Sequence, residues 1–199
     1  MNSGPTVAGL ILAAGESRRM GFPKALLSYR NETFLDSIYA RFAKRCCPVI
    51  VVLGAHADRI RTSTSVPADF VVNERYLSGQ TSSMQCGLRA VPAGVDGVLF
   101  TLVDHPAVSP STIDALIDGQ ESSGATLLRV PRYQGKRGHP IWLCSALIPE
   151  FLALPEQGAA RDIVRSHADQ TEFLDVDDPG ILADIDDPEA YRQLTGAVV

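Results

Sequence analysis

Three continuous apolar runs constrain the fold of this chain more than any other feature of its sequence. They are Val7–Leu12, Pro48–Leu53 and Val98–Val103. A strand with one face in water alternates apolar and polar side chains, whereas these runs predict strands that are covered on both faces. Segments with helical spacing separate them, at Phe34–Lys44 and Ser82–Ala90. This alternation predicts a three-layer α/β fold, in which a mainly parallel sheet carries helices on both faces.

Weaker patterns predict the remaining elements. Short apolar segments bounded by turn residues indicate further strands at Phe70–Val72, Thr126–Val130, Pro140–Leu143 and Phe173–Val176. Helices are expected at Pro110–Gln120, with Ser109 as the cap, and at Pro149–Leu154, Ala160–His167 and Pro188–Leu194.

Length and composition indicate one globular domain over residues 1–199. The chain has 199 residues, 45% of them hydrophobic, and a net charge of −5, which argues against nucleic acid as a partner. No apolar run approaches the roughly 20 residues that span a bilayer, so no membrane association is expected. The first residues do not resemble a signal peptide, and the four cysteines have no CxxC spacing. We therefore expect a cytoplasmic protein with reduced thiols.

The loop that follows the first predicted strand has the composition of a polyphosphate site. The segment Leu12–Lys24 reads LAAGESRRMGFPK and contains two glycines, two arginines and a lysine. Glycines allow backbone N–H groups to approach phosphate oxygens, and the cations balance the phosphate charge. The segment lacks the GxxxxGK[ST] spacing of a Walker A motif and the GxGxxG spacing of a dinucleotide fingerprint. With no acidic residue directly after Leu53, a nicotinamide oxidoreductase is a poor match.

Acidic residues at two other places could hold a divalent cation. Asp104 directly follows the third apolar run, and ligands in such folds bind where the strands end. An extended Asp184–Asp186 segment would place its two aspartates on one face, and magnesium needs only one or two protein carboxylates. A turn or a helix cap remains the alternative for Asp104. The neighbouring His105 is expected to point away from Asp104.

Two glycine-containing loops are weaker candidates. Ser78–Ser83, SGQTSS, could contact a base or a ribose, although ordinary helix caps have the same composition. Arg137–Pro140, RGHP, carries a histidine that could face a cleft, and a hairpin turn is the alternative.

Taken together, these segments resemble the motifs of a known family. LAAGESRRMGFPK resembles the LAAGxSxRMGxxK signature of nucleotidylyltransferases, and more narrowly the chain is similar to the molybdenum cofactor cytidylyltransferase branch, related to the guanylyltransferases. The similarity extends over nearly the whole chain, through Asn73–Ser83, Val103–Pro106, Arg137–Pro140 and Asp184–Tyr191. It implies a fold like that of the nucleotide-diphospho-sugar transferases. It also implies a reaction, in which a substrate phosphate attacks the α-phosphorus of a nucleoside triphosphate and pyrophosphate leaves.

The resemblance also implies roles for individual residues. The catalytic set would be Arg19, Lys24 and Asp104, and Asp104 and Asp186 would hold Mg²⁺, with Mn²⁺ as an alternative. The nucleotide would be bound by Leu12, Ala13, Ala14, Gly15, Arg19, Lys24, Gly79, Gln80 and Ser82. The acceptor side would include His105, His139 and Arg161.

Departures from the family pattern affect mainly the acceptor. The metal motif here is Asp104-His-Pro, where Met or Gln is more usual after the aspartate, and the later Gly-Ala-Arg pattern appears as Gln157-Gly-Ala-Ala-Arg161. The LAAG at Leu12–Gly15 favours the cytidylyl type, because the guanylyl type usually has LAGG. CTP and a phosphorylated pterin are thus the implied substrates, and a molybdoenzyme or its maturation factor the implied recipient. A sugar or alcohol phosphate acceptor, and a non-catalytic cofactor-delivery protein, remain alternatives.

Overall fold

The computed structural model describes residues 4–119, 126–155 and 158–196 of the chain. The end of the predicted helix at Gln120, the first three residues and Gln157 lie outside these ranges. The strands are β1 (Val7–Ala13), β2 (Ser28–Tyr29), β3 (Glu32–Thr33), β4 (Val49–Leu53), β5 (Asp69–Val72), β6 (Gly97–Leu102), β7 (Leu128–Tyr133), β8 (Lys136–Arg137), β9 (Ile141–Cys144) and β10 (Thr171–Asp175). The α-helices are α1 (Phe34–Phe42), α2 (Ala57–Ser63), α3 (Gln80–Arg89), α4 (Pro110–Asp118), α5 (Ile148–Ala153), α6 (Ala160–Ser166) and α7 (Pro188–Thr195). No helix in these ranges is both long and apolar enough to cross a bilayer.

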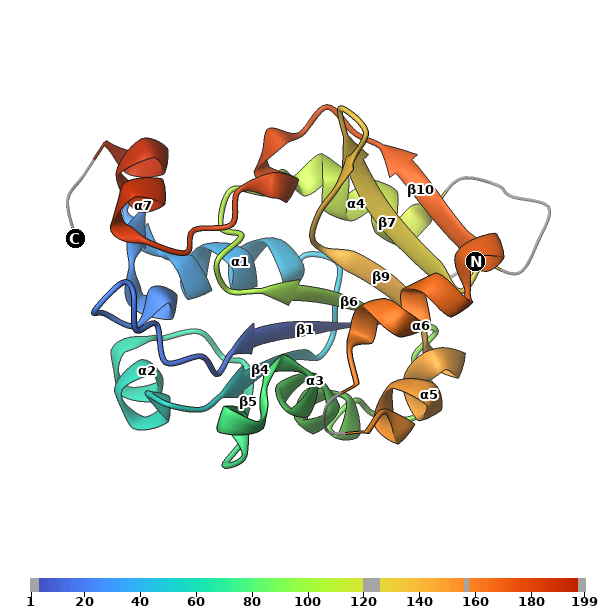
Figure 1. Ribbon diagram of the computed structural model, residues 1–199, viewed down its shortest axis with the longest axis horizontal. Coiled ribbons are helices and arrows are strands. Elements are labelled where there is room, and N and C mark those ends of the chain that lie inside the picture. Colours follow the sequence, from blue (N-terminus) through green and yellow to red (C-terminus); the bar gives the residue numbers. More distant parts are fainter. Residues whose placement is uncertain (1–3, 120–125, 156–157, 197–199) are drawn as a thin grey trace.

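One mixed sheet, parallel across β6, β1, β4 and β5, forms the centre of the molecule (Figure 1). Its strand order is β10-β7-β9-β6-β1-β4-β5, and β8 pairs with β7. The strands β7 and β10 are also parallel, whereas β9 runs antiparallel to both β6 and β7. The predicted mainly parallel sheet is confirmed, with β9 as the element that reverses direction.

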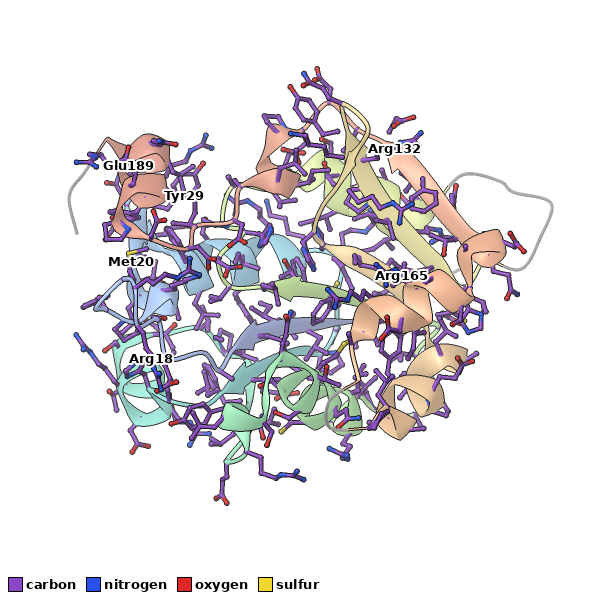
Figure 2. The ribbon with its side chains drawn as sticks, viewed as in Figure 1. Arg18, Met20, Tyr29, Arg132, Arg165 and Glu189 are labelled. Carbon is purple, nitrogen blue, oxygen red and sulfur yellow. The ribbon has the colours of Figure 1, made fainter. Side chains whose placement is uncertain are left out.

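Helices cover both faces of this sheet, as the apolar runs predict. Along β1, Val7 and Ile11 point to one face and Ala8 and Leu10 to the other, and all four are buried. The first face packs against α1, α2, α4 and α7, and the second against α3, α5 and α6. Side chains fill the space between the layers (Figure 2). The three-layer arrangement is therefore built by strands that are apolar on both faces.

Most element positions agree with the sequence prediction, and the helix caps explain why. Thr33, Ser109 and Asp187 each begin a helix by accepting a hydrogen bond from the backbone N–H three residues later. Such caps satisfy N–H groups that the first turn of a helix leaves free.

Helix α2, the β2–β3 hairpin and the short strand β8 were absent from the prediction. Helix α2 buries only Ile60, so its sequence lacks an apolar stripe that would indicate a helix. The short β2–β3 hairpin turns at Arg30 and Asn31, which both have positive φ angles, of 51° and 68°. Neither residue is a glycine, so the usual signal for such a turn is missing.

Candidate active site

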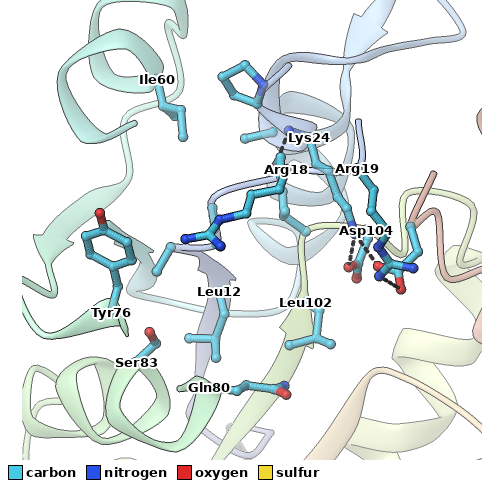
Figure 3. A pocket seen from close by; sticks show the side chains of 18 of the residues that line it. Leu12, Arg18, Arg19, Lys24, Ile60, Tyr76, Gln80, Ser83, Leu102 and Asp104 are labelled. Carbon is cyan, nitrogen blue, oxygen red and sulfur yellow. Dashed lines mark hydrogen bonds and ion pairs between the residues drawn. The ribbon is translucent and has the colours of Figure 1, made fainter. Parts of the chain in front are cut away.

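A pocket of about 370 Å³ opens at the carboxyl ends of β1 and β6 (Figure 3). In the parallel pairing of these strands, Leu12 lies opposite Leu102, so the loops that follow the two strands emerge side by side. The pocket is lined by ten residues that the sequence predicts for the site: Leu12, Ala13, Ala14, Gly15, Arg19, Lys24, Gly79, Gln80, Asp104 and Asp186. Strand register thus gathers residues that are far apart in the chain.

The loop after β1 is held in a compact shape by its own backbone. Ser17 and Gly21 have positive φ angles, of 52° and 66°, and the N–H groups of Met20 and Gly21 donate to the Ser17 carbonyl. The Ser17 hydroxyl accepts a hydrogen bond of 3.1 Å from the Lys24 backbone N–H. These hydrogen bonds hold the loop backbone in one conformation, so its cationic side chains extend into the pocket from fixed positions.

Lys24 lies between two carboxylates at one end of the pocket. Its Nζ donates to Asp104 Oδ2 at 2.9 Å and to Asp186 Oδ1 at 2.5 Å, and Arg19 pairs with the other oxygen of Asp186. Figure 3 shows these contacts as dashed lines, with Arg18 extending instead toward Tyr76. Burial would lower the pKa of Lys24, but Asp104 and Asp186 together raise it above its ordinary value. The Lys24 ammonium therefore stays charged near neutral pH.

A third aspartate joins this cluster. Oxygens of Asp104, Asp184 and Asp186 lie within 4.8 Å of one another. The Ile185 N–H donates to the Asp104 carbonyl at 3.1 Å, which fixes the segment carrying Asp184 and Asp186 against the loop after β6. Burial and the two neighbouring carboxylates raise the pKa of Asp184. Clustered carboxylate oxygens are the donors that Mg²⁺ and Mn²⁺ prefer, so these residues fit such an ion.

The expectation that His105 points away from Asp104 is wrong. His105 Nδ1 lies 2.9 Å from Asp104 Oδ1, and the ring is buried. Burial alone would raise the pKa of Asp104, but the hydrogen bond from His105 and the charge of Lys24 lower it to about 2. His105 thus contacts Asp104, a candidate metal ligand, and it does not itself line the nucleotide pocket.

His139 packs against His105, with ring centroids 4.9 Å apart. Burial, together with the neighbouring His105, lowers the pKa of His139 to about 4. The His139 imidazole is therefore neutral at physiological pH. It lines a second cavity together with Arg161, so these two of the three predicted acceptor-side residues share one location.

The helix α3 contributes a different serine from the one predicted. The Ser82 hydroxyl has the carbonyls of Gly79 and Arg75 as acceptors for its one proton and accepts from Asn73, so its hydrogen bonds stay within this loop. Ser83 lines the pocket instead. If the helix is taken to start at Gln80, Ser83 lies on the same face as Gln80, because residues three apart in a helix share a face. The helical spacing therefore indicates Ser83 as the pocket residue.

Arg18 and Tyr76 are among the pocket residues that were not predicted. Arg18 has a largely exposed guanidinium that pairs with Glu16, and Tyr76 lies across the pocket from the loop. Arg18 is part of the cationic loop, but the family signature fixes only the second arginine of its Arg-Arg pair. Tyr76 precedes the Ser78–Ser83 loop and lies within the Asn73–Ser83 stretch of the family resemblance, which gave it no role.

Comparisons with known proteins agree with this geometry. A family model described as MobA-like NTP transferase domain matches residues 9–171. The chain is 33% identical to the nicotine blue oxidoreductase of Paenarthrobacter nicotinovorans, covering 96% of this chain and 97% of that protein. It is 30% identical to the purine catabolism protein PucB of Bacillus subtilis, covering 98% of each. Identity to the molybdenum cofactor cytidylyltransferase of Escherichia coli is 25%, over 92% of each chain.

Solved structures extend the similarity to three dimensions. The crystal structure of Rv0371c from Mycobacterium tuberculosis H37Rv superposes with a TM-score of 0.82 at 32% identity, covering 97% of this chain and 100% of that one. A structure of Rv0371c in complex with manganese has a TM-score of 0.75 at 29% identity, with the same coverage. The 4-diphosphocytidyl-2C-methyl-D-erythritol synthase of Anaerococcus prevotii, 12% identical with a TM-score of 0.73 and 98% coverage of each chain, shares the fold of nucleotide-diphospho-sugar transferases. The loop, the carboxylate cluster and these matches along nearly the whole chain together show that it belongs to the MobA-like NTP transferase family of nucleotidyltransferases.

Proposed function

We propose that this protein transfers CMP from CTP to the phosphate of a molybdopterin-type acceptor, with Mg²⁺ as cofactor and pyrophosphate as the second product. The observation that carries the proposal is the contact of Lys24 with Asp104 and Asp186 at the end of a pocket bounded by the LAAG loop. This places a cation and a potential metal site together beside a loop suited to phosphate. A molybdoenzyme or its maturation factor would receive the product.

The chemistry needs electrostatic stabilisation more than a base. An oxygen of the acceptor phosphate forms a bond to the α-phosphorus of CTP, and the bond from that phosphorus to the α,β-bridging oxygen breaks, so pyrophosphate leaves with the electron pair. The attacking phosphate is already ionised at neutral pH, so no residue has to remove a proton from it. The difficulty is to bring two polyanions together in line.

The residues of the pocket match these needs. Lys24 and Arg19 would neutralise the triphosphate and hold it in line, and Arg18 is within the same loop to assist them. Asp104 and Asp186, with Asp184 beside them, would hold the metal ion. When bound, the ion would neutralise charge on the phosphates as a Lewis acid. Asp104 in turn is oriented by His105, which contacts its second oxygen.

Ala14 supports cytosine as the base. This residue lines the pocket, and its methyl group lies against Gly54, where an added Cβ would come within 3.0 Å of the Ala14 Cβ. The methyl group therefore occupies space that a glycine at position 14 would leave open. A smaller pocket favours the smaller pyrimidine base. Relatives named for both bases match, a molybdenum cofactor cytidylyltransferase and probable molybdenum cofactor guanylyltransferases, so the support for cytosine comes from Ala14 alone.

Other functions of the family compete with this one. A sugar or alcohol phosphate acceptor would use the same pocket and metal site. A cofactor-delivery protein would bind the same ligands without turnover. The relative named nicotine blue oxidoreductase adds a redox reaction as a further alternative. Among the described residues, the cation–carboxylate cluster favours phosphoryl chemistry over each of these non-transferase functions.

A substrate screen separates these cases. The purified protein is incubated with Mg²⁺, one acceptor and one of CTP, GTP, ATP or UTP, and pyrophosphate is measured. CTP-selective release with molybdopterin supports the proposal, whereas release only with a sugar or alcohol phosphate replaces the acceptor. A parallel arm follows NADH oxidation in the presence of a dye acceptor. Dye reduction without pyrophosphate release under any condition would reject the proposal in favour of redox chemistry.

A further inference from the structure

The segment that follows β4 supports the loop that borders the nucleotide pocket. Leu53 at the end of β4 lies opposite Ala13 at the end of β1, so the segments after the two strands emerge side by side. In the segment after β4, the Ala55 N–H donates to the Ala14 carbonyl at 3.1 Å. Gly54 permits this approach, because a Cβ there would lie 2.4 Å from the same carbonyl oxygen. The start of the loop is therefore held from the β4 side.

His56 makes a second contact between these segments. Its Nε2 atom lies 3.1 Å from the Glu16 carbonyl oxygen. A carbonyl oxygen only accepts hydrogen bonds, so the imidazole donates through Nε2. His56 also precedes the first turn of α2, where a side chain commonly caps the helix, but its ring makes no such cap. The ring therefore binds the loop after β1 instead of its own helix.

The two contacts set the direction of two backbone N–H groups. In a trans peptide, the C=O and N–H bonds point in opposite directions. The carbonyls of Ala14 and Glu16 both accept from the segment after β4. The N–H groups of the same two peptides, which belong to Gly15 and Ser17, are therefore turned away from that segment. Both residues line the nucleotide pocket, and neither N–H donates to another residue in the described part of the chain.

We propose that His56 is a positioning residue, which orients the peptide between Glu16 and Ser17 so that its N–H binds a phosphate oxygen of the nucleotide. The inference rests on the proposed function, because it concerns the same nucleotide site. Ser17 has a φ of 52°, and successive N–H groups around such a residue form concave sites for anions. The Glu16 side chain also pairs with Arg18 at 2.8 Å, so holding Glu16 in place also holds a partner of this pocket arginine.

The test compares variants of His56 in the full-length protein, with inorganic tripolyphosphate and CTP as probes. His56→Phe keeps a ring but has no donor, whereas His56→Gln can place an amide N–H near the Glu16 carbonyl. Isothermal titration calorimetry gives the dissociation constant for each probe, and thermal unfolding shows whether each variant is folded. Thr62→Ala is the matched control, because the Thr62 hydroxyl bonds only to carbonyls of α2 itself.

The expected pattern differs from that of a purely structural contact. His56→Phe should weaken binding of both probes about tenfold or more, because an N–H that binds an anion loses its fixed direction. His56→Gln should recover most of the affinity, and Thr62→Ala should match the wild type. In ¹H–¹⁵N spectra, tripolyphosphate should shift the Ser17 amide proton downfield in the wild type and in His56→Gln, but not in His56→Phe. A purely structural contact would change the unfolding temperature and leave the affinity of the folded variants unchanged.

The results also distinguish this inference from the proposed function. Weaker binding in His56→Phe with recovery in His56→Gln supports the inference, even if no pyrophosphate is released in any substrate screen. Equal dissociation constants for the wild type and folded His56→Phe overturn it, even where CMP transfer to molybdopterin is observed. So does a wild-type protein that binds neither probe, or one whose Ser17 amide does not respond to tripolyphosphate. If His56→Phe fails to fold, His56→Asn, whose side chain is too short to reach the carbonyl, takes its place.

Discussion

Lys24 Nζ lies 2.9 Å from Asp104 Oδ2, although 80 residues separate these two side chains in the sequence. The parallel pairing of β1 with β6 brings the two together, because each residue follows the end of one of these strands. Asp186 completes the contact from the segment before α7. The pair therefore joins the loop suited to phosphate with the carboxylates suited to a metal ion.

Replacing Lys24 should separate metal binding from catalysis. Lys24→Met removes a positive charge beside Asp104 and Asp186, so we expect Mn²⁺ to bind at least as tightly as in the wild type. Turnover should fall on the order of 10²-fold or more, because the triphosphate loses its electrostatic partner. Electron paramagnetic resonance measures free Mn²⁺, and pyrophosphate release measures turnover. Lys44→Met, at an exposed lysine, is the control and should change neither. Weaker Mn²⁺ binding in Lys24→Met would contradict the assignment of these carboxylates as ligands.

Two glycines near the pocket should respond differently to alanine. At Gly54, a Cβ would lie 2.4 Å from the Ala14 carbonyl oxygen, so Gly54→Ala should destabilise the protein by at least about 1 kcal/mol. At Gly15, a Cβ meets nothing within 4 Å, so Gly15→Ala should leave stability unchanged. Because Gly15 lines the pocket, its variant should nevertheless bind CTP more weakly. Thermal unfolding and titration with CTP measure both effects. Unchanged CTP affinity in Gly15→Ala would remove this loop from the nucleotide site.

The low pKa of His139 predicts how stability depends on pH. Its pKa is about 4 in the folded protein and 6.5 when unperturbed, so the unfolded state binds more protons between these values. The free energy of unfolding should therefore fall as the pH is lowered from 6.5 to 4, by up to about 3 kcal/mol from this group. His139→Gln should lack that part of the decrease in urea titrations at each pH.

His167 provides the control for this experiment. Its hydrogen bond with Glu150 raises its pKa, so its contribution to stability is present at low pH and is lost as the pH rises. His167→Gln should keep the decrease toward pH 4 that the wild type shows. An identical pH dependence in the wild type and His139→Gln would show that His139 is not buried as a neutral group.

Ala14 should influence the choice of base. Ala14→Gly removes a methyl group that lines the pocket beside Gly54, which makes room for a purine. We expect the ratio of kcat/KM for CTP to that for GTP to fall about tenfold, the effect of roughly one methyl group in a binding pocket. Steady-state pyrophosphate release with each nucleotide gives the ratio. A ratio that stays constant while both activities fall would show that Ala14 supports the loop without selecting the base.

The sequence was sufficient for the parts of the site that depend on strand ends. Apolar runs predicted β1 and β6, and segments that follow parallel strands meet at one sheet edge, so the loop after β1 and Asp104 could be expected together. The spacing of Asp184 and Asp186 predicted a possible cation site, and the family resemblance selected Asp186. The position of Asp186 beside Lys24 follows from contacts of a segment without regular structure.

The remaining features depend on tertiary packing that no local pattern encodes. The His105 ring contacts the side chain of Asp104, its neighbour in the chain. The ring is buried because it packs against α1 and α4. The second cavity is lined by residues of α3, α6, β7 and β9. In the sequence, the apolar residues among them look the same as residues of an ordinary hydrophobic core. The family resemblance grouped His139 and Arg161 on the acceptor side, and the fold shows that both line one cavity.

The most direct test of the central claim is product formation by the wild type and by Asp104→Ala. The protein is incubated with Mg²⁺, CTP and molybdopterin, and pyrophosphate and the CMP-bearing product are measured together by ³¹P nuclear magnetic resonance. Asp114→Ala, which alters a half-exposed aspartate paired with Arg45, is the control. We predict equal amounts of both products from the wild type and Asp114→Ala, and a loss on the order of 10²-fold or more in folded Asp104→Ala. Near-normal pyrophosphate release by Asp104→Ala, or none by the wild type, would contradict the account.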